Sequence, residues 1–320
     1  MIELPGIAEI WAARRRIASH IHKTPLLSSR SLGAARSARL WLKAENLQRA
    51  GAFKIRGALH ALLRCEERGE LGPAGVLTYS SGNHGQAVAL AATIVGCRAS
   101  VVVPRDVARV KRAAIEAHGA SVVECGLTSE ERREGAERLA AETGAAIIPP
   151  YDHPDVIAGQ GTIALEVLED LPDVDAILVP VGGGGLISGI AIGVKALRPT
   201  VRIVGVEPAT ANDMALSLAA RRKVRIPPSS TIADGLRAVT PGDLTFEAAL
   251  RFVDDVWCVE DDAIRRAQRA LLERAKLLAE PSGAAALAAF AEAGSGLEGK
   301  TVVVIVSGGN ADSSDAAALS

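Results

Sequence analysis

The sequence predicts an α/β fold built from open, twisted, mostly parallel sheets that are flanked by helices. Two observations support this fold class. Short runs of Val and Ile are continuous rather than alternating with polar residues, which is typical of strands buried on both faces of a sheet. Segments with helical periodicity separate these runs one after another, as the crossover connections of a parallel sheet require.

In the first half of the chain, this alternation begins near residue 75. The expected strands are the apolar runs at 75–80, 99–104, 121–125 and 146–150. The expected helices lie between them at 84–96, 108–119 and 129–144. Gly96 and Gly144 close two of these helices, because glycine readily adopts the left-handed conformation that commonly ends a helix.

The alternation resumes after the Pro-Pro-Tyr at 149–151, which we interpret as a boundary because adjacent prolines interrupt regular structure. Residues 1–20 add an amphipathic helix. The other elements are helices at 151–171, 186–199 and 261–292 and strands at 175–181, 202–208, 254–260 and 301–309. We therefore expect a larger lobe formed by 1–74 and 151–320, with a smaller lobe, 75–150, inserted into it.

Composition and charge exclude several classes of protein. The 320 residues carry 36 basic and 37 acidic side chains, so no excess charge is available for nucleic acid or an anionic membrane. No apolar run approaches the roughly 18 residues that span a bilayer, and the N-terminus lacks the features of a signal peptide. The four cysteines are scattered without a CxxC pair, which favours reduced thiols. We expect a soluble, cytoplasmic protein.

The segment "GAFKIRGA" at 51–58 places Lys54 where a helical pattern begins. The positive end of the helix dipole and burial beside Phe53 and Ile55 both disfavour a charged ammonium group. A surface lysine with a buried stem is one explanation. The other is a lysine kept neutral so that it can attack a carbonyl group. Taken alone, the segment favours the surface lysine.

Polar or glycine-rich loops follow four of the predicted strands, where ligands bind in open α/β sheets. "SSGNHGQA" at 80–87 offers hydroxyl, amide and imidazole groups at a helix start and exceeds what capping needs. "GGGG" at 182–185 allows backbone N–H groups to approach an anion, and we favour a phosphate cradle over a flexible turn. Neither GxGxxG nor a Walker lysine is present there, which argues against nucleotide chemistry.

The other two loops are less distinctive. Glu207 and Asp213 lie in one turn with Ala211 between them, and two carboxylates with a backbone carbonyl would suit Mg²⁺ or Ca²⁺. From this loop alone, a capping Asp213 and a solvated Glu207 are the simpler explanation. Helix capping explains Ser307 in "SGGN" almost as well as a ligand role does. Considered together, the four loops and the lysine would suit a phosphorylated aldehyde bonded to that lysine, which is pyridoxal phosphate.

With these motifs, the chain resembles the serine/threonine dehydratase and serine racemase family of fold type II pyridoxal-phosphate enzymes. The resemblance covers nearly the whole chain and rests on segments in family order and spacing: "GAFKIRGA", "SSGNHGQA", "AGQGTIALEV", "VGGGGLISG", "TIADGL", "EPSGAAALAA" and "SGGN". Such an ordered set is far more specific than any one of its members. It implies two open, mostly parallel sheets and a small mobile lobe that closes on a bound amino acid.

The resemblance also implies a role for each matching residue around pyridoxal 5'-phosphate. Lys54 matches the lysine that bonds to the cofactor aldehyde and later takes the Cα proton. Phe53 matches the residue against the pyridine ring, Asn83 the partner of the 3-hydroxyl group, and Ser307 the partner of the ring nitrogen. The remaining matches form the phosphate loop or lie near the cofactor: Gly182, Gly183, Gly184, Gly185, Leu186, Gly235 and Glu280.

Further matches concern the substrate and a cation. The loop that holds the substrate carboxylate matches Ser80, Ser81, Asn83 and His84. In racemases of the family, the hydroxyl that Ser81 matches faces Cα from the side opposite the lysine. Arg132 aligns with an arginine that approaches a dicarboxylate in eukaryotic serine racemases, although a solvated helix charge explains it equally well. The family's divalent-cation site (Mg²⁺, Ca²⁺ or Mn²⁺) matches Glu207, Ala211 and Asp213, which reverses the capping interpretation.

The activity favoured by the resemblance is dehydration of L-threonine or L-serine to a 2-oxo acid and ammonia. Ala238 and Val239 stand where the racemases carry serines, and "IPPYD" at 148–152 is more similar to the catabolic threonine dehydratases. Ser81 suits both activities and does not decide between them. Serine racemase, alone or as a second activity, and 3-hydroxyaspartate dehydratase stay open, as do β-replacement chemistry and a non-catalytic ligand-binding relic.

Three further expectations come from the resemblance. A neutral hydroxyl such as that of Ser307 does not enforce protonation of the ring nitrogen as an aspartate would, which favours elimination over transamination. A homodimer is implied by the family alone. The chain ends at Ser320, soon after "SGGN", so neither a C-terminal regulatory domain nor feedback by isoleucine is expected.

Overall fold

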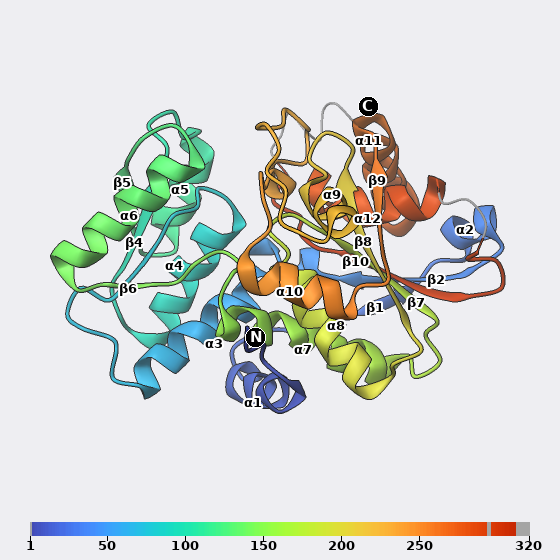
Figure 1. The fold of residues 1–320 in the computed structure, drawn as a ribbon, viewed down its shortest axis with the longest axis horizontal. Helices are drawn as coiled ribbons and strands as arrows, with labels where there is room; N and C mark the ends of the chain where they lie inside the picture. Colours follow the sequence, from blue (N-terminus) through green and yellow to red (C-terminus); the bar gives the residue numbers. More distant parts are fainter. Residues whose placement is uncertain (1, 293–295, 312–320) are drawn as a thin grey trace.

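The computed structural model describes residues 2–292 and 296–311 and contains two separate sheets, one of six strands and one of four. Figure 1 shows the two sheets at opposite ends of the longest axis, each with its own helices. The four strands of the small sheet all lie between residues 75 and 150, and the six strands of the large sheet lie outside that range. The predicted pair of open, mostly parallel sheets is therefore confirmed.

The large sheet has the strand order β1-β2-β10-β7-β8-β9. Its strands are β1 (Leu26–Ser28), β2 (Arg39–Ala44), β7 (Ala176–Pro180), β8 (Arg202–Pro208), β9 (Asp255–Val259) and β10 (Thr301–Val306). Neighbouring strands are parallel except for β1, which is antiparallel to β2. Strands β1 and β2 were not among the expected elements, whereas the other four were.

Both faces of the large sheet are covered by helices, which explains its continuous apolar strands. Along β10, Val302, Val304 and Val306 pack under α11 (Asp261–Ala270) and α12 (Pro281–Glu292), while Val303 and Ile305 face the opposite layer. The helices of that opposite layer are α7 (Pro154–Asp170) and α8 (Gly185–Leu197). Because the side chains of a strand alternate between faces, burial on both sides leaves no polar position in the run.

The small sheet is entirely parallel, with the strand order β5-β4-β3-β6. Its strands are β3 (Val76–Thr78), β4 (Ala99–Val103), β5 (Ser121–Glu124) and β6 (Ala146–Ile147). The helices around it are α3 (Lys54–Glu67), α4 (Asn83–Val95), α5 (Arg109–Ala117) and α6 (Ser129–Thr143). Helices α3, α4 and α5 cover one face and α6 covers the other.

The single helix expected over 261–292 is wrong. The chain forms α11 (Asp261–Ala270), a π-helical turn (Leu271–Ala275) and, after an irregular segment, α12 (Pro281–Glu292). Lys276 has a φ of 60°, a left-handed conformation that ends the first helix. Pro281 then occupies the first position of the next helix, where its missing N–H group costs nothing.

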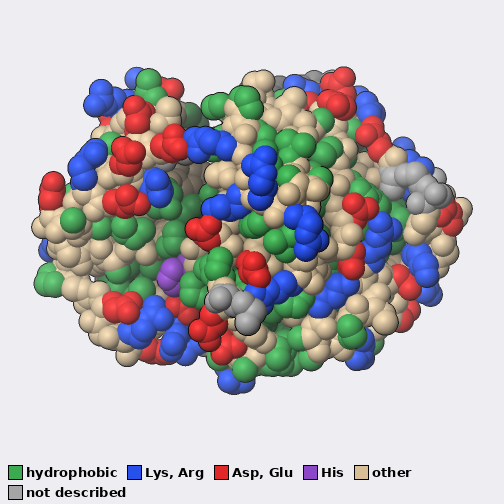
Figure 2. Space-filling model, viewed as in Figure 1, with side chains coloured by type: hydrophobic (Ala, Val, Ile, Leu, Met, Phe, Trp, Pro, Cys, Tyr) green, Lys and Arg blue, Asp and Glu red, His purple; other side chains and the backbone are tan. Residues whose placement is uncertain are grey.

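The remaining elements are short or lie at the edges of the molecule. They are α1 (Ile7–Ile17), α2 (Arg30–Gly33), α9 (Asp213–Ala220), α10 (Asp243–Phe252) and 3-10 turns at Ala34–Arg36, Glu45–Leu47, Arg49–Gly51 and Asp234–Leu236. Within the described ranges, no helix is both long and apolar enough to cross a membrane. Figure 2 shows basic and acidic side chains interspersed over the face in view, in keeping with a formal net charge of −1.

Candidate active site

Lys54 is the first residue of α3, and the segment before it pairs with the segment that follows β10. Phe53 donates its backbone N–H to the carbonyl oxygen of Ser307 (3.1 Å), and Ala52 forms a β-bridge with Gly308. Residues that are far apart in the sequence are therefore held side by side at the carboxyl end of β10. This is the edge of a parallel sheet where ligands bind.

The environment of Lys54 disfavours its charged form. Nζ donates to the carbonyl oxygen of Pro150 (2.7 Å) and lies 5.1 Å from the centre of the Phe53 ring. Burial lowers the pKa of Lys54 to about 8, although the nearby Glu280 carboxylate opposes this shift. The amine therefore holds a proton weakly near neutral pH, as a nucleophile or base requires.

Asn83 connects the helix layer of the small sheet to the same edge. Asn83 is the first residue of α4; its Nδ2 donates to Glu280 Oε1 (2.6 Å), and its Oδ1 accepts from Asn310 (2.8 Å). A Cβ atom on Gly308 would lie 2.3 Å from Glu280 Oε1, so any larger residue would displace the Glu280 carboxylate from this pair. Asn83, Glu280 and the SGGN segment thus form one polar group.

His84 and the two serines of the same loop have different surroundings. The His84 ring is buried, and its Nε2 lies 3.0 Å from the carbonyl oxygen of Ile148. Burial, with a smaller contribution from Lys54, lowers the pKa of His84 to about 3, so the ring is neutral. Ser80 and Ser81 lie between β3 and α4 and are partly exposed, which leaves their hydroxyl groups accessible to a ligand.

The glycine loop lies between β7 and α8 and packs against an aromatic wall. A Cβ atom on Gly183 would lie 2.3 Å from the Tyr151 ring, and one on Gly182 would lie 2.9 Å from the carbonyl oxygen of Gly235. Gly184 has a φ of 92°, which strains any other residue. Because Tyr151 follows Pro150, whose carbonyl binds Lys54, this contact joins the glycine loop to the lysine.

The amino-terminal end of α8 presents free hydrogen-bond donors. Within the described residues, no protein acceptor binds the backbone N–H groups of residues 183–187, which include Leu186. The first backbone N–H group with a partner is that of Ser188, which donates to the carbonyl oxygen of Gly184 (3.0 Å). The helix has 13 residues, so its dipole adds a positive potential at this end. Free N–H groups at such a position suit a phosphate group.

Ser307 is linked to the glycine loop through α12. Its hydroxyl is buried and lies 3.4 Å from the carbonyl oxygen of Ser282, the second residue of α12. The Ser282 hydroxyl in turn accepts from the backbone N–H of Gly235 (2.9 Å), which lies against Gly182. No helix follows Ser307 up to residue 311, so Ser307 is not a helix cap.

Glu207 and Asp213 form a separate buried acidic pair at the end of β8. Both side chains are 0 % exposed, and Glu207 accepts from the backbone N–H groups of Met214 (3.0 Å) and Ala215 (2.8 Å). The interpretation from this loop alone is therefore wrong, because Glu207 is not solvated and itself satisfies the first turn of α9. Both carboxylate oxygens of Asp213 lack a hydrogen-bond partner within the described residues.

The acidic pair is electrostatically uncompensated. Burial raises the pKa of Asp213 to about 7; burial and the Asp213 charge together raise that of Glu207 to about 8. Ala211 is buried between them. No group of three or more His, Cys, Asp or Glu side chains with metal-binding geometry occurs in the described part of the chain. A cation here would therefore need oxygen ligands from the backbone or water besides the two carboxylates.

Arg132 is not brought together with the other candidates. It lies on α6 beside the small sheet, and its guanidinium donates to the carbonyl oxygen of Leu127 (3.0 Å). The charges that influence its pKa are those of Asp106 and Glu131, both in the same region of the small sheet. Neither contact links it to the Lys54 site.

Two residues of the site were not identified from the sequence. Tyr151 forms the wall of the glycine loop, and burial raises its pKa to about 12. Ser282 bridges Ser307 and Gly235. The sequence signal for Tyr151 is its place directly after the predicted strand 146–150, at the edge of a sheet where ligands bind. Ser282 follows a helix-starting proline, where a serine is unremarkable.

With this geometry described, comparison with known proteins defines the class. Residues 17–308 match the family model described as "Pyridoxal-phosphate dependent enzyme". The chain therefore belongs to this family of pyridoxal-phosphate-dependent enzymes, with the fold type II architecture, and within it to the branch of lyases and racemases. The residues fit the cofactor, because the free N–H donors at the start of α8 can bind its phosphate and the half-buried Lys54 amine of lowered pKa can bond to its aldehyde.

Three relatives represent the activities found in this branch. The structure of maize serine racemase aligns with a TM-score of 0.93 and 42% identity, covering 98% of this chain and 95% of that chain. An L-threonine ammonia-lyase of Thermotoga maritima is 42% identical over 98% of this chain and 76% of its own length. An L-threo-3-hydroxyaspartate ammonia-lyase of Saccharomyces cerevisiae is 41% identical over 97% of this chain and 94% of its own length.

Proposed function

We propose that this enzyme is an ammonia-lyase that converts L-threonine and L-serine to 2-oxobutanoate and pyruvate, with release of ammonia. The observation that carries the proposal is Lys54, a half-buried amine with a pKa of about 8. Pro150 and Tyr151 join it to the glycine loop, where free N–H donors begin α8. The similarity to an L-threonine ammonia-lyase supports the substrate class. Ala238 and Val239 support dehydration, since they stand where racemases carry serines.

The chain's own residues divide the work of holding the cofactor. Residues 183–187 would bind its phosphate through backbone N–H groups, and Phe53 would lie against its ring. Asn83 would bind its 3-hydroxyl group and Ser307 its ring nitrogen. Bound pyridoxal phosphate supplies an electron sink for the carbanion formed when the Cα proton leaves. Lys54 takes that proton, and its lowered pKa keeps it unprotonated often enough to do so.

The loop from Ser80 to His84 would bind the substrate. Its serine hydroxyls are partly exposed at the start of α4, where a carboxylate is favourable. The neutral His84 is held by Ile148 O and supports this loop from beneath rather than transferring a proton. We propose that residues 75–150 form a mobile unit that moves toward the larger lobe (1–74 and 151–320) and excludes water when the substrate binds.

Ser307 would favour elimination over transamination. Its neutral, buried hydroxyl faces the place proposed for the ring nitrogen and cannot hold a positive charge there as a carboxylate would. We expect Ser307→Asp to increase transamination relative to 2-oxo acid formation by elimination. The ratio of the two products, measured in the variant and the wild type with L-serine, tests this, and an unchanged ratio contradicts it.

We further propose that Glu207, Asp213 and the backbone carbonyl of Ala211 bind a divalent cation, Mg²⁺, Ca²⁺ or Mn²⁺. The support is physical: two fully buried carboxylates lie together, and the Asp213 oxygens have no described protein partner. Such a pair is costly without a positive charge, and oxygen ligands suit these hard cations.

Serine racemase is the second candidate function. The similarity to maize serine racemase and the accessible Ser81 hydroxyl favour it, because racemisation needs a second proton-transferring group on the other face of Cα. A substrate with a second carboxylate is a third possibility, for which Arg132 is the proposed contact.

One assay separates these activities. The purified enzyme is incubated with L-threonine, L-serine, D-serine and L-threo-3-hydroxyaspartate, with and without Mg²⁺, while 2-oxo acid and the enantiomer ratio are followed together. The proposal predicts fastest 2-oxo acid release from L-threonine or L-serine. Predominant interconversion of serine enantiomers would replace it with the racemase, and a requirement for added sulfide would indicate β-replacement.

A further inference from the structure

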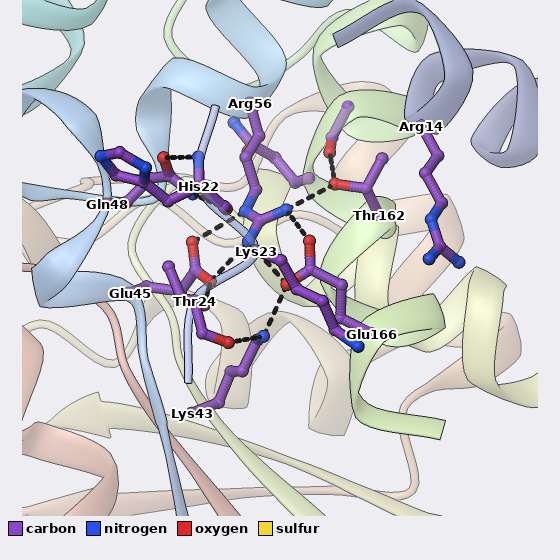
Figure 3. Close-up of polar contacts among 12 residues, drawn as sticks. Arg14, His22, Lys23, Thr24, Lys43, Glu45, Gln48, Arg56, Thr162 and Glu166 are labelled. Atoms are coloured by element: carbon purple, nitrogen blue, oxygen red, sulfur yellow. Dashed lines mark hydrogen bonds and ion pairs between the residues drawn. The ribbon is translucent and has the colours of Figure 1, made fainter. Parts of the chain in front are cut away.

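Four charged side chains are buried directly behind the start of α3. We call Lys43, Glu45, Arg56 and Glu166 the buried quartet; the first three are 0 % exposed and Glu166 is 5 % exposed. They come from β2, the turn after it, α3 and α7. Figure 3 shows the Arg56 guanidinium between the two carboxylates, with Lys43 reaching Glu166 from the strand.

Arg56 is the centre of the buried quartet. It binds Glu45 in a fork, from Nε (2.8 Å) and Nη2 (2.8 Å), and binds Glu166 in a second fork, from Nη1 (2.7 Å) and Nη2 (2.9 Å). Nη1 also donates to the Thr162 hydroxyl (3.1 Å). All five N–H donors of the guanidinium therefore have an acceptor, which a planar fork allows and an ammonium group does not.

The charges of the buried quartet balance. Lys43 donates to Glu166 (2.5 Å) and to the carbonyl oxygen of Thr24 (2.7 Å), and the Thr24 hydroxyl donates to Glu45. Two cations face two carboxylates, so no partner from outside is needed. Buried ion pairs of this kind give little net stability compared with apolar residues of similar shape, because desolvation offsets their attraction. What they do provide is a fixed geometry.

The same turn of α3 also touches the backbone of α7. A Cβ atom on Gly159 would lie 2.6 Å from Arg56 O and 2.6 Å from Gly57 Cα, so the two helices cross at closest approach there. The Gly57 N–H donates to the Gln160 side chain (3.2 Å), which satisfies one of the free donors of the helix start. The first turn is therefore fixed from two directions, by α7 and by the end of β2.

Lys54 and Arg56 lie on different faces of this one turn. Two residues along an α-helix are separated by about 200° of rotation, so one side chain reaches the site while the other reaches the core. We propose that the buried quartet is a positioning device, in which Arg56 fixes the rotation and depth of α3 and so places Lys54 Nζ. This inference rests on the proposed role of Lys54 and makes Arg56 a positioning residue rather than a catalytic one.

Arg56→Lys tests the proposal because it keeps the charge balance and loses the two forks. The full-length chain, freed of cofactor, is mixed with pyridoxal 5'-phosphate, and the adduct trapped on Lys54 by borohydride is measured over time and across pH. We expect adduct formation to slow by up to about 10²-fold, the effect of a displacement near 1 Å. The pH midpoint near 8 should not move, because the net charge around the amine is unchanged.

Glu169→Gln is the matched control, since Glu169 lies one turn further along α7 and pairs with Arg14 at the surface. It should leave the rate unchanged. A wild-type rate in a folded Arg56→Lys protein would overturn this inference and leave the proposed function untouched. A slower rate with a shifted pH midpoint would also overturn the inference, because it would indicate an effect of charge.

If Arg56→Lys does not fold, Thr162→Val is tested instead, because it removes one hydrogen bond of Arg56. A several-fold slower adduct rate is then expected, and an unchanged rate overturns the inference. A wild-type protein that forms no adduct at Lys54 would overturn the proposed function, and this inference with it.

Discussion

Lys43 and Lys54 are two lysines that face the interior, eleven positions apart, with opposite surroundings. Lys43 is 0 % exposed and donates to the carboxylate of Glu166. Lys54 donates to a neutral carbonyl, that of Pro150, and burial lowers its pKa to about 8. The difference teaches that burial alone does not make a reactive amine. A lysine that donates to a neutral carbonyl receives no compensating charge from that acceptor, so burial lowers its pKa.

The largest expected effect concerns Lys54, the reactive lysine of the two. Lys54→Ala should lower the rate of 2-oxo acid formation by more than about 10³-fold, because it removes both the cofactor attachment and the base. Turnover with L-threonine is the measurement. Lys195→Ala, which removes a partly buried lysine paired with Asp254, should leave turnover unchanged. Substantial turnover in the Lys54 variant would contradict the assignment.

The next largest effect concerns Lys43, the lysine that pairs with the Glu166 carboxylate. Glu166→Gln leaves Lys43 and Arg56 with one carboxylate between them, and we expect the free energy of unfolding to fall by about 3 kcal/mol. Glu169→Gln on the same helix removes only a surface pair and should cost about 0.5 kcal/mol or less. Urea unfolding of both variants tests this. Equal, small losses would show that the buried quartet is not electrostatically coupled.

The acidic pair Glu207 and Asp213 extends the comparison to buried charges that have no protein counter-charge among residues 2–292 and 296–311. Their pKa values, about 8 and about 7, lie above those of unfolded carboxyl groups, so stability without a cation should fall as pH rises from about 4 to 8. A bound cation replaces the protons. At a hundredfold excess over Kd, Mg²⁺ should therefore add about 2.7 kcal/mol. At one fixed Mg²⁺ concentration, the stabilisation should be larger near pH 8 than near pH 5.5, because protons compete for the carboxylates at the lower pH.

Thermal unfolding with Mg²⁺, Ca²⁺ or Mn²⁺ measures this stabilisation. It should disappear in Asp213→Asn and persist in Glu247→Gln, which alters a partly exposed carboxylate on α10 that pairs with Arg251. Stabilisation that is equal in all three proteins would place the cation elsewhere.

The smallest effect sharpens the description of Lys54 itself. Only the neutral amine reacts with an aldehyde, so below about pH 8 the rate of adduct formation with added pyridoxal 5'-phosphate should rise about tenfold per pH unit. It should level off above that pH. Stopped-flow absorbance provides the rate, and a profile that keeps rising to pH 10.5 would mean that Lys54 behaves as an ordinary lysine.

Much of the fold was predictable because it depends on local patterns. The strands β3 to β10 are apolar runs between turn residues, and burial on both faces of a parallel sheet produces that pattern directly. Strand β2, "RLWLKA", was not predictable in the same way, because the buried Lys43 within it depends on Glu166 and the Thr24 carbonyl, which lie elsewhere in the sequence. The break after α11 depends on one left-handed residue, Lys276, which the helical periodicity does not reveal.

The same difference between local patterns and long-range contacts applies to the candidate site. The glycine loop, Lys54 and Ser307 lie at strand ends or at a helix start, and their sequence signal becomes strong only when these motifs are considered together. The buried quartet joins Arg56 to Glu166 across 110 positions, and no local pattern reports such a pairing. Tyr151 and Ser282 are ordinary residues whose importance comes only from what they touch. The homodimer implied by the family and the cytoplasmic location expected from the composition stay predictions.

The most direct measurement is the position of the covalent bond to the cofactor. The purified enzyme is reduced with borohydride and digested, and the peptides are located by mass spectrometry. The account predicts that the pyridoxyl group is found on the peptide containing Lys54 and is absent from that containing Lys43. A label on Lys43, or spread over several lysines with none at Lys54, would contradict it.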